Sequence, residues 1–266
     1  MPDRTLIEQL REAIGEEKVL TSLEERIAYS YDGTFEQNLP DLAVLPESTE
    51  DVVAIVGLAA NHGVPIIPRG MGSGLAAGSV PFGGGIALSL TRMNRILEID
   101  QENYTVRVET GIITADLEEA VAKHGLFYPP DPASNEQSTI GGNIACNGGG
   151  PRCLKYGVTG DYVMGLTVVT ADGQVLSTGG KAIKNVVGYD LTSLFVGSEG
   201  TLGVITEALL RLVAKPAFVR TARAEFPALE DASRTVNALL DAGVVPATLE
   251  MMDETAITCI EEAMEL

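Results

Sequence analysis

The sequence predicts a mixture of helices and strands, in which at least part of the sheet structure is antiparallel. Residues 42–67 run strand, helix, strand, an order typical of a parallel crossover. Residues 104–108 alternate between polar and apolar side chains, as a half-buried strand does. Residues 166–176 place an Asp-Gly pair between two apolar runs, which is the strongest short-range signal for an antiparallel hairpin.

The N-terminal region is expected to be helical over residues 3–30. Leu6, Leu10 and Ile14 recur at the spacing that places side chains on one face of a helix. Gly15 follows the last of them and is suited to end the first helix.

The expected crossover is bounded by clear start and stop signals. A short apolar strand at 42–45 is followed by residues 48–51, which resemble a capping box. An apolar stripe at helical spacing then runs to His62 and Gly63, which close the helix. Residues 64–67 are apolar and form the next strand.

Further elements are predicted by the same rules of alternation, periodicity and capping. Thr114 is expected to cap a helix that His124 and Gly125 end. After Pro216 the pattern changes, and a second domain is expected to begin there. The further elements are strands at 86–90, 104–108, 220–226 and 248–252, and helices at 114–124, 227–242 and 253–266.

A glycine-rich segment at 68–75 follows strand 64–67 and predicts a phosphate-binding loop. It places three glycines in five positions, and bare backbone of this kind can come close to a ligand. Successive N–H groups in such a loop form a concave site for phosphate oxygens. A surface turn that needs glycine is the alternative. The residues of the predicted loop are Pro68, Arg69, Gly70, Met71, Gly72, Ser73, Gly74 and Leu75.

Two familiar phosphate-binding motifs do not fit this loop. No Gly-Lys-Ser/Thr follows at the spacing of a Walker A loop. Residues 72–77 form a degenerate dinucleotide fingerprint, which requires a helix directly behind it. Residues 78–85 contain one proline and four glycines, a composition that disfavours a helix.

Two more segments are rich in glycine or proline. Residues 128–151 combine a proline cluster with a second glycine cluster, and residues 185–206 carry glycines at every third position near their end. A long stretch without regular pattern is unusual inside a compact domain unless it binds something. We therefore expect residues 128–151 to bind a ligand together with 68–75; an irregular surface connection is the alternative.

The composition excludes one class of ligand. The chain has 266 residues, with 18 Lys and Arg against 37 Asp and Glu, so its formal net charge is −19. Such a chain lacks the basic surface that nucleic acids require. Backbone N–H groups can still bind phosphate without net positive charge, so a phosphate ligand remains open.

Few side chains are candidates for catalysis or for a metal. Three cysteines in a chain of this length are no disulfide framework, and Cys146 and Cys153 lack metal-ligand spacing. We expect them to be buried, inert thiols. His62 and His124 both precede a glycine at a helix end, where capping is the ordinary role. We expect no metal site.

The glycine and proline segments, in this order, resemble those of FAD-linked oxidases of the vanillyl-alcohol oxidase (PCMH-type) family. Within that family the chain looks most like the glycolate oxidase FAD-binding subunit and D-lactate dehydrogenases. The resemblance covers residues 5–266. The motifs that carry it are 68–74, 129–132, 139–143, 149–157 and 197–206.

The resemblance implies an α+β fold, with a two-subdomain FAD-binding PCMH-type domain over residues 1–215 followed by a cap domain. We expect the subdomains at about 1–105 and 106–215, with the cofactor clamped between them. Residues 216–266 would be the beginning of an α+β substrate or cap domain, and we expect the chain to end inside it.

The resemblance also implies which residues hold FAD. The 68–75 loop would cradle the pyrophosphate, and other segments would lie along the flavin and the adenine. No histidine lies between His62 and His124, so we expect non-covalent FAD. Besides that loop, the expected cofactor-binding residues are Pro132, Thr139, Gly141, Gly142, Asn143, Gly149, Gly157, Gly200, Gly203, Val204 and Ile205.

The implied activity is FAD-dependent oxidation of a D-2-hydroxy acid, such as glycolate or D-lactate, to the 2-oxo acid. Electrons would pass to a partner subunit, a quinone or a carrier. The family's histidine-rich metal site and substrate arginine belong to a C-terminal half that these residues lack, so no catalytic residue is named. One alternative is an FAD-binding module, or a split subunit, without independent catalysis. A cell-wall precursor reductase that uses NADPH is another.

The expected location follows from segments that the chain lacks. The N-terminus has no signal peptide pattern, and no apolar run is long enough to span a bilayer. We therefore expect a cytoplasmic protein, which partner subunits could bring to the inner membrane.

Overall fold

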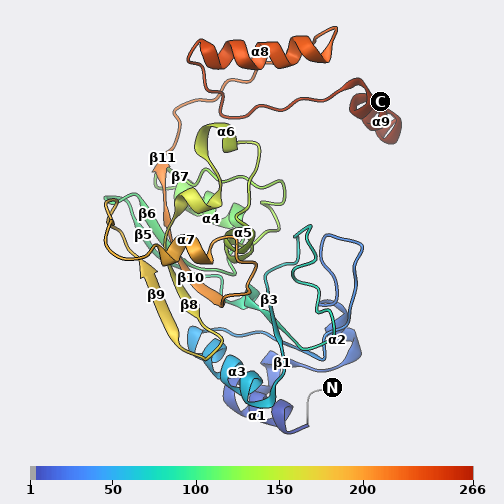
Figure 1. The fold of residues 1–266 in the computed structure, drawn as a ribbon, viewed down its shortest axis with the longest axis vertical. Coiled ribbons are helices and arrows are strands. Elements are labelled where there is room, and N and C mark those ends of the chain that lie inside the picture. Colours follow the sequence, from blue (N-terminus) through green and yellow to red (C-terminus); the bar gives the residue numbers. More distant parts are fainter. Residues whose placement is uncertain (1–3, 266) are drawn as a thin grey trace.

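The structure, a computed structural model, describes residues 4–265 and contains two main sheets with helices packed on them (Figure 1). The first sheet has the strand order β1-β2-β4-β3. Its strands are β1 (Val19–Leu20), β2 (Leu42–Val44), β4 (Ile86–Ser89) and β3 (Ile66–Arg69), and the helices of this region are α1 (Arg4–Ile14), α2 (Leu23–Ile27) and α3 (Thr49–His62).

The parallel crossover predicted for residues 42–67 is confirmed. β2 and β3 both pair in parallel with β4, which lies between them, and β1 adds an antiparallel edge. The Ser48 side chain accepts a hydrogen bond from the Asp51 N–H at 3.1 Å, which caps the N-terminus of α3. Gly63 ends the helix with a φ of 64°.

The second sheet is antiparallel throughout, with the order β5-β6-β10-β8-β9. The predicted hairpin is confirmed, and Gly173 turns between β8 and β9 with a φ of 79°. The strands are β5 (Ile96–Asp100), β6 (Thr105–Glu109), β8 (Val163–Val169), β9 (Val175–Gly179) and β10 (Val204–Arg211), and a separate pair joins β7 (Leu126–Phe127) to β11 (Val213–Ala214).

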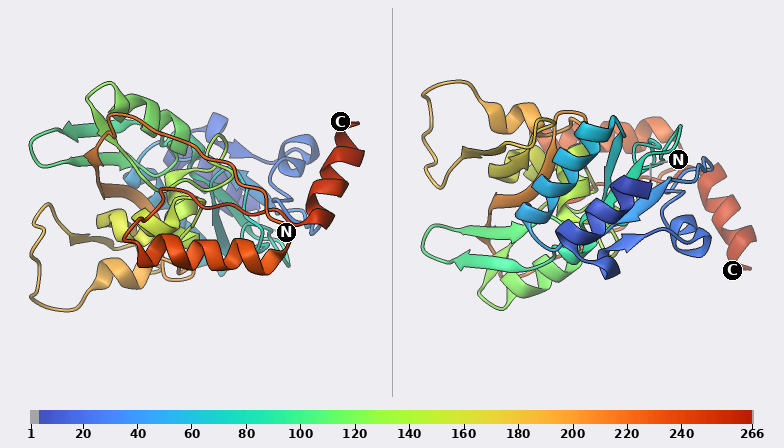
Figure 2. Two further views of the ribbon diagram at one scale, coloured as in Figure 1. Left: turned by 90° about the horizontal axis from the view of Figure 1, so that it is seen from above. Right: turned by 90° about the horizontal axis from the view of Figure 1, so that it is seen from below.

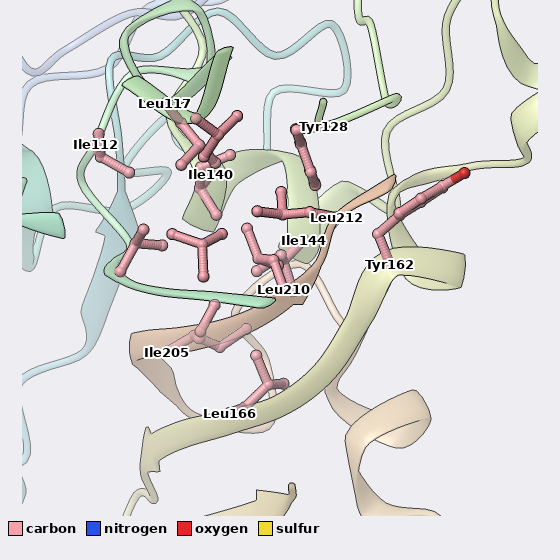
Figure 3. Close-up of a cluster of buried hydrophobic side chains, with 14 of the residues drawn as sticks. Ile112, Leu117, Tyr128, Ile140, Ile144, Tyr162, Leu166, Ile205, Leu210 and Leu212 are labelled. Atoms are coloured by element: carbon pink, nitrogen blue, oxygen red, sulfur yellow. The ribbon is translucent and has the colours of Figure 1, made fainter. Parts of the chain in front are cut away.

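Two helices cover the core side of this second sheet. They are α4 (Thr114–Ala122) and α5 (Ile140–Cys146), while α6 (Cys153–Tyr156) and α7 (Leu191–Phe195) are short. Figure 3 shows Leu117 of α4 and Ile140 and Ile144 of α5 gathered against side chains of the sheet, including Leu210. This apolar packing holds α5 in place.

Several expectations need correction. Residues 138–146 were expected to be irregular, but most of them form α5, because Ile140 and Ile144 are fully buried and offset the low helix propensity of the glycines. Thr114 is not an N-cap: it is the first residue of α4, and its hydroxyl donates to the Ser138 carbonyl at 3.0 Å. Strands β1, β5, β7, β10 and β11 were not predicted.

The C-terminal region differs from expectation in its strands. α8 (Leu229–Asp241) and α9 (Glu254–Met264) are present as predicted, and residue 266 lies outside the described residues. The strands expected at 220–226 and 248–252 are absent, because a strand needs a neighbouring strand and neither segment has one among residues 4–265. Figure 1 shows α8 and α9 standing away from both sheets.

The change from the first sheet to the second falls between Ser89 and Ile96. A subdomain division that followed the sheets would therefore lie earlier than the expected residue 105, and the domain boundaries stay a prediction. Figure 2 shows the β5–β6 turn and the loop after β9 projecting at one end of the molecule, with both termini toward the other end.

Candidate cofactor-binding site

A cavity of about 1130 Å³ is lined by residues from both sheets and from all three glycine-rich regions. Pockets for small molecules usually hold about 300 to 1,000 Å³, so this one suits a ligand longer than most. The segments around it are 68–79, 132–139, 141–149 and 199–205. Segments that lie far apart in the sequence therefore meet at one place.

Most of the residues expected to hold a cofactor line this cavity, but Gly157 and Val204 do not. Gly157 ends α6, and its positive φ and contact with Asp161 explain the glycine without a ligand. The Val204 side chain packs in the core of the first sheet. The expected residues that line the cavity are Pro68, Arg69, Gly70, Met71, Gly72, Ser73, Gly74, Leu75, Pro132, Thr139, Gly141, Gly142, Asn143, Gly149, Gly200, Gly203 and Ile205.

The loop after β3 presents unused hydrogen-bond donors. The N–H groups of Met71, Gly72, Ser73 and Gly74 donate no hydrogen bond to any residue between 4 and 265. The loop is held instead through a carbonyl, since Gly74 O accepts from the Gly33 N–H at 3.0 Å. Four consecutive free donors on a cavity wall are what a pyrophosphate requires.

Glycine is needed in this loop because the backbone is closely packed. A Cβ at Gly70 would lie 2.1 Å from the Thr139 hydroxyl, which belongs to the cap of α5. Gly72 has a φ of 75°, and its Cβ would lie 2.1 Å from Arg69 Nη2. The loop therefore lies directly against the N-terminus of α5 on one side and a guanidinium on the other.

Arg69 supports the loop from beneath. Its side chain is buried, and Nη1 donates to the carbonyls of Tyr29 and Tyr31 at 3.0 and 3.1 Å. Burial lowers the pKa of the guanidinium, but the ordinary value is high enough that the group stays charged. Nη2 donates to none of the residues that the structure describes, so a positive charge with a free donor lies next to Gly72.

The N–H groups of the first turn of α5 are already used within the protein. Gly142 N donates to the Thr139 hydroxyl at 3.2 Å, Gly141 N to Thr110 O at 2.7 Å, and Ile140 N to Ile112 O at 2.9 Å. Gly141 and Gly142 therefore have no N–H group left for a ligand, and a Cβ at Gly141 would lie 2.9 Å from Thr110 Cβ. The buried Asn143 amide likewise donates to another protein group, the Thr114 hydroxyl, at 2.7 Å.

The third glycine segment packs onto the first. Gly200 has a φ of 75°, and its Cβ would lie 3.0 Å from Pro68 Cγ. Glu199 also has a positive φ, 51°, and its N–H donates to Ala145 O at 2.9 Å. Residues 199–200 are thus fixed between the 68–75 loop and α5, which closes the wall of the cavity.

Some lining residues were not found from the sequence. Most of them lie within or next to the predicted glycine-rich segments but were not singled out, whereas Asp32, Leu90 and Thr110 lie outside those segments. The one available signal for Asp32 was its place in an Asp-Gly-Thr sequence. The lining residues that were not singled out from the sequence are Asp32, Ala76, Gly78, Ser79, Leu90, Thr110, Ala133, Ser134, Asn135, Glu136, Gln137, Ser138, Ala145, Cys146, Gly148 and Glu199.

Among the described cysteines and histidines, one lines the cavity and the others do not. Cys146 lines the cavity and is exposed, so the expectation that it is buried is wrong, while Cys153 is half-buried. Desolvation, with the Glu199 charge as a second cause, raises the pKa of the Cys146 thiol. His62 and His124 contact glutamines, Gln9 and Gln101, and neither lines the cavity.

Two structural searches gave negative results for the described part of the chain. Within residues 4–265, no three His, Cys, Asp or Glu side chains are grouped so that they could hold a metal ion. No helix in that range has both the length and the apolar character needed to cross a membrane.

The models of two known protein families match parts of this chain. Residues 40–179 match the family described as "FAD binding domain", and residues 215–266 match "FAD linked oxidases, C-terminal domain". The chain belongs to the FAD-linked oxidase family. The resemblance drawn from the sequence motifs is thereby confirmed, as is the mixed α+β fold.

Individual relatives point the same way. The glycolate oxidase subunit GlcD of Bacillus subtilis is 49% identical over 96% of this chain and 54% of its own length. A D-lactate dehydrogenase of Anaerostipes hadrus is 38% identical over 97% of this chain and 54% of its own length. The chain thus spans about half the length of the curated relatives it matches.

Solved structures share the fold. Alkyldihydroxyacetonephosphate synthase superposes with a TM-score of 0.82 at 28% identity, over 93% of this chain and 47% of that one. p-Cresol methylhydroxylase with substrate bound gives a TM-score of 0.76 at 22% identity, over 88% and 48%, which bears on the fold alone.

Proposed function

We propose that this chain binds FAD in the cavity, with the pyrophosphate on the 68–75 loop. The observation that carries the proposal is the run of four free N–H groups from Met71 to Gly74, beside the Arg69 guanidinium. Together they supply directed donors and one positive charge where the other charged residues of the wall, Asp32, Glu136 and Glu199, are acidic. The match to an FAD binding domain over residues 40–179 supports the same ligand.

The remaining expected residues would shape the cavity around the cofactor. Glycines at 141, 200 and 203 let the segments of the wall pack closely on one another, because a Cβ there would lie 2.9 Å from Thr110 Cβ, 3.0 Å from Pro68 Cγ and 2.7 Å from Val168 Cγ1. A flat ring of the cofactor would lie against this closely packed backbone. Thr139 and Asn143 hold α5 in position through the hydrogen bonds described above. Their proposed role is to keep the wall rigid rather than to bond the cofactor.

We propose that the cofactor is held without a covalent bond. Among the described residues that line the cavity, Cys146 is the one nucleophile of the Cys or His type. The raised pKa of its thiol disfavours the thiolate, which is the form that would attack a flavin. Neither histidine lines the cavity, so no imidazole is placed for attachment.

The proposed activity is oxidation of a D-2-hydroxy acid, with glycolate and D-lactate as the candidates. When bound, FAD supplies the electron acceptor for this oxidation. Support comes from the two relatives named above, a glycolate oxidase subunit and a D-lactate dehydrogenase. We propose that electrons leave through a partner subunit or a carrier, and that the whole protein is cytoplasmic.

A second function is favoured by one observation: the chain spans about half of its relatives. It could be an FAD-binding module whose substrate site is completed by another polypeptide segment. α8 and α9 bury none of their residues, so their apolar faces are open to such a segment. Both functions require FAD, and they differ in whether this chain alone reacts with substrate.

Anaerobic titration of the FAD-loaded chain separates the two functions. Bleaching of the flavin absorbance by D-lactate or glycolate, but not by L-lactate, is the result expected of an independent oxidoreductase. Bound flavin that neither hydroxy acid bleaches would contradict that function and leave the binding module. Restoration of bleaching by a separately expressed C-terminal half of a relative would then identify the missing part.

A further inference from the structure

Asp32 is a buried acid on the wall of the cavity, outside all the glycine motifs. It is 8% exposed, and it follows the segment that Arg69 holds through the Tyr29 and Tyr31 carbonyls. Its Oδ1 accepts two hydrogen bonds from Thr34, from the N–H at 2.8 Å and from the hydroxyl at 2.6 Å. Oδ2 is buried and has no partner among residues 4–265.

An unpartnered carboxylate oxygen is costly in a protein interior, so a nearby donor is expected. Arg69 does not serve as that donor, although the Asp32 charge is close enough to offset part of the lowering that burial causes in the pKa of the guanidinium. The hydrogen bonds that Arg69 makes go to backbone carbonyls instead, and no ion pair joins the two described side chains. Oδ2 is therefore free to bond a ligand.

The position of Asp32 limits what that ligand group can be. The next residue, Gly33, donates to Gly74 O, and a Cβ on it would lie 2.8 Å from the same oxygen. Asp32 thus stands directly beside the loop proposed for the pyrophosphate. A carboxylate repels phosphate oxygens, but it accepts hydrogen bonds from hydroxyls. In FAD the pyrophosphate has sugar hydroxyls on both sides, those of the ribityl chain and those of the ribose.

We propose that Asp32 Oδ2 accepts a hydrogen bond from a sugar hydroxyl of the dinucleotide, adjacent to its pyrophosphate. This role rests on the proposed FAD site and makes Asp32 a recognition residue within it. Thr34 is the positioning residue, since its two hydrogen bonds to Oδ1 fix the carboxylate in one orientation. The arrangement would favour a ligand that carries both a pyrophosphate and a neighbouring hydroxyl.

The test compares Asp32→Asn with the matched control Glu36→Gln. Asparagine keeps the size of the side chain and one oxygen for Thr34, but it replaces the free acceptor by an amide. Glu36 lies in the same segment, is exposed and is not on the cavity wall, so its variant removes the same charge. Quenching of flavin fluorescence gives the dissociation constant of FAD for each protein.

We expect Asp32→Asn to weaken FAD binding about ten- to a hundredfold, as loss of a charged hydrogen bond does. Glu36→Gln should bind FAD as the unchanged chain does. Asp32→Asn binding within about twofold of that chain would overturn the proposal. An unchanged chain that binds neither FAD nor ADP would overturn the cofactor site as well, so the two failures are distinct.

Two fragments of FAD show which sugar hydroxyl Asp32 contacts. They also separate recognition of the ligand by Asp32 from a structural role of Asp32 beside Arg69. ADP carries the ribose and a pyrophosphate, and FMN carries the ribityl chain and one phosphate. A loss for ADP but not FMN assigns the ribose, and the reverse assigns the ribityl chain. A drop in the melting temperature of the ligand-free Asp32→Asn protein, with equal losses for both fragments, would assign Asp32 to structural support and overturn the proposal.

Discussion

Gly72 is the residue at which the proposed site depends most on the absence of a side chain. Its φ is 75°, and a Cβ would lie 2.1 Å from Arg69 Nη2. We predict that Gly72→Val abolishes retention of FAD, because the side chain would force apart the loop and the guanidinium beneath it. Flavin absorbance per chain after loading and desalting measures this.

The matched control for that variant is Gly57→Ala. Gly57 lies within α3, away from the cavity wall, and a Cβ there meets nothing within 4 Å. This variant should retain FAD, and alanine should stabilise the helix by about 1 kcal/mol. A Gly72→Val protein with a full complement of flavin would remove the loop from the site.

Glu118 gives a prediction about pH. Burial raises the pKa of its carboxyl to about 7, although Arg152 Nη1 lies 3.5 Å from it. The folded chain therefore holds this proton more tightly than the unfolded chain, whose glutamate has a pKa near 4.5. This contribution to stability is full below the unfolded pKa and is lost as the pH rises toward 7.

Glu118→Gln should remove this loss of stability at rising pH, since glutamine carries no ionisable proton. Above pH 7 the variant should be more stable than the unchanged chain by roughly 1 to 3 kcal/mol, and the difference should shrink as the pH falls toward 4.5. Urea unfolding at several pH values measures it. Glu119→Gln, an exposed neighbour whose pKa is lowered by Lys123, should show no such trend. A constant difference for Glu118→Gln would contradict the assignment.

Some single residues of the candidate site could be predicted from the sequence, and others could not. The glycines of the 68–75 loop could be predicted, because only glycine tolerates the close approach that a phosphate loop makes. Asp32 and Glu199 could not, because one acid in a polar segment has the same pattern whether it faces solvent or a cavity. The exposure of Cys146 was likewise decided by tertiary packing around the end of α5.

At the scale of elements, α5 links the stability of the fold to the proposed site. Thr139 caps this helix, and its hydroxyl also lies where a Cβ of Gly70 would be. We predict that Thr139→Val lowers the free energy of unfolding by about 1 kcal/mol, the usual cost of a lost cap. It should also weaken FAD binding, because the loop packs on that cap.

Ser48→Ala is the control for this element. Ser48 caps α3 with the same kind of hydrogen bond, but it is not on the cavity wall. Its loss should cost a similar free energy of unfolding while the dissociation constant of FAD stays unchanged. Equal effects of the two variants on FAD affinity would show that the cap of α5 has no special place in the site.

The elements that could be predicted are those with their own local signals. Residues that are close in sequence specify the apolar stripe and the caps of α3. They also specify the Asp-Gly turn of the β8–β9 hairpin. α5 could not be predicted, because two glycines in its first turn give the segment a low helix propensity and the helix is stabilised by packing instead. β5 and β7 form only because β6 and β11 lie beside them.

At the scale of the whole molecule, the fold could be predicted through the order of several motifs rather than through periodicity. Local sequence patterns predicted individual helices and strands. They did not predict that two sheets border one cavity. The loop after β9 and the helices α8 and α9 leave large apolar side chains exposed, among them Ile183, Val187 and Tyr189. Residues 215–266, which include α8 and α9, match the family described as "FAD linked oxidases, C-terminal domain".

The visible absorbance spectrum of the purified chain, loaded with FAD and desalted, tests the central claim most directly. The account predicts a yellow protein with about one flavin per chain, all of which passes into the supernatant as intact FAD on acid precipitation. A chain that is folded by circular dichroism yet stays colourless after loading would contradict the proposed site, and flavin that remains in the acid pellet would contradict non-covalent binding.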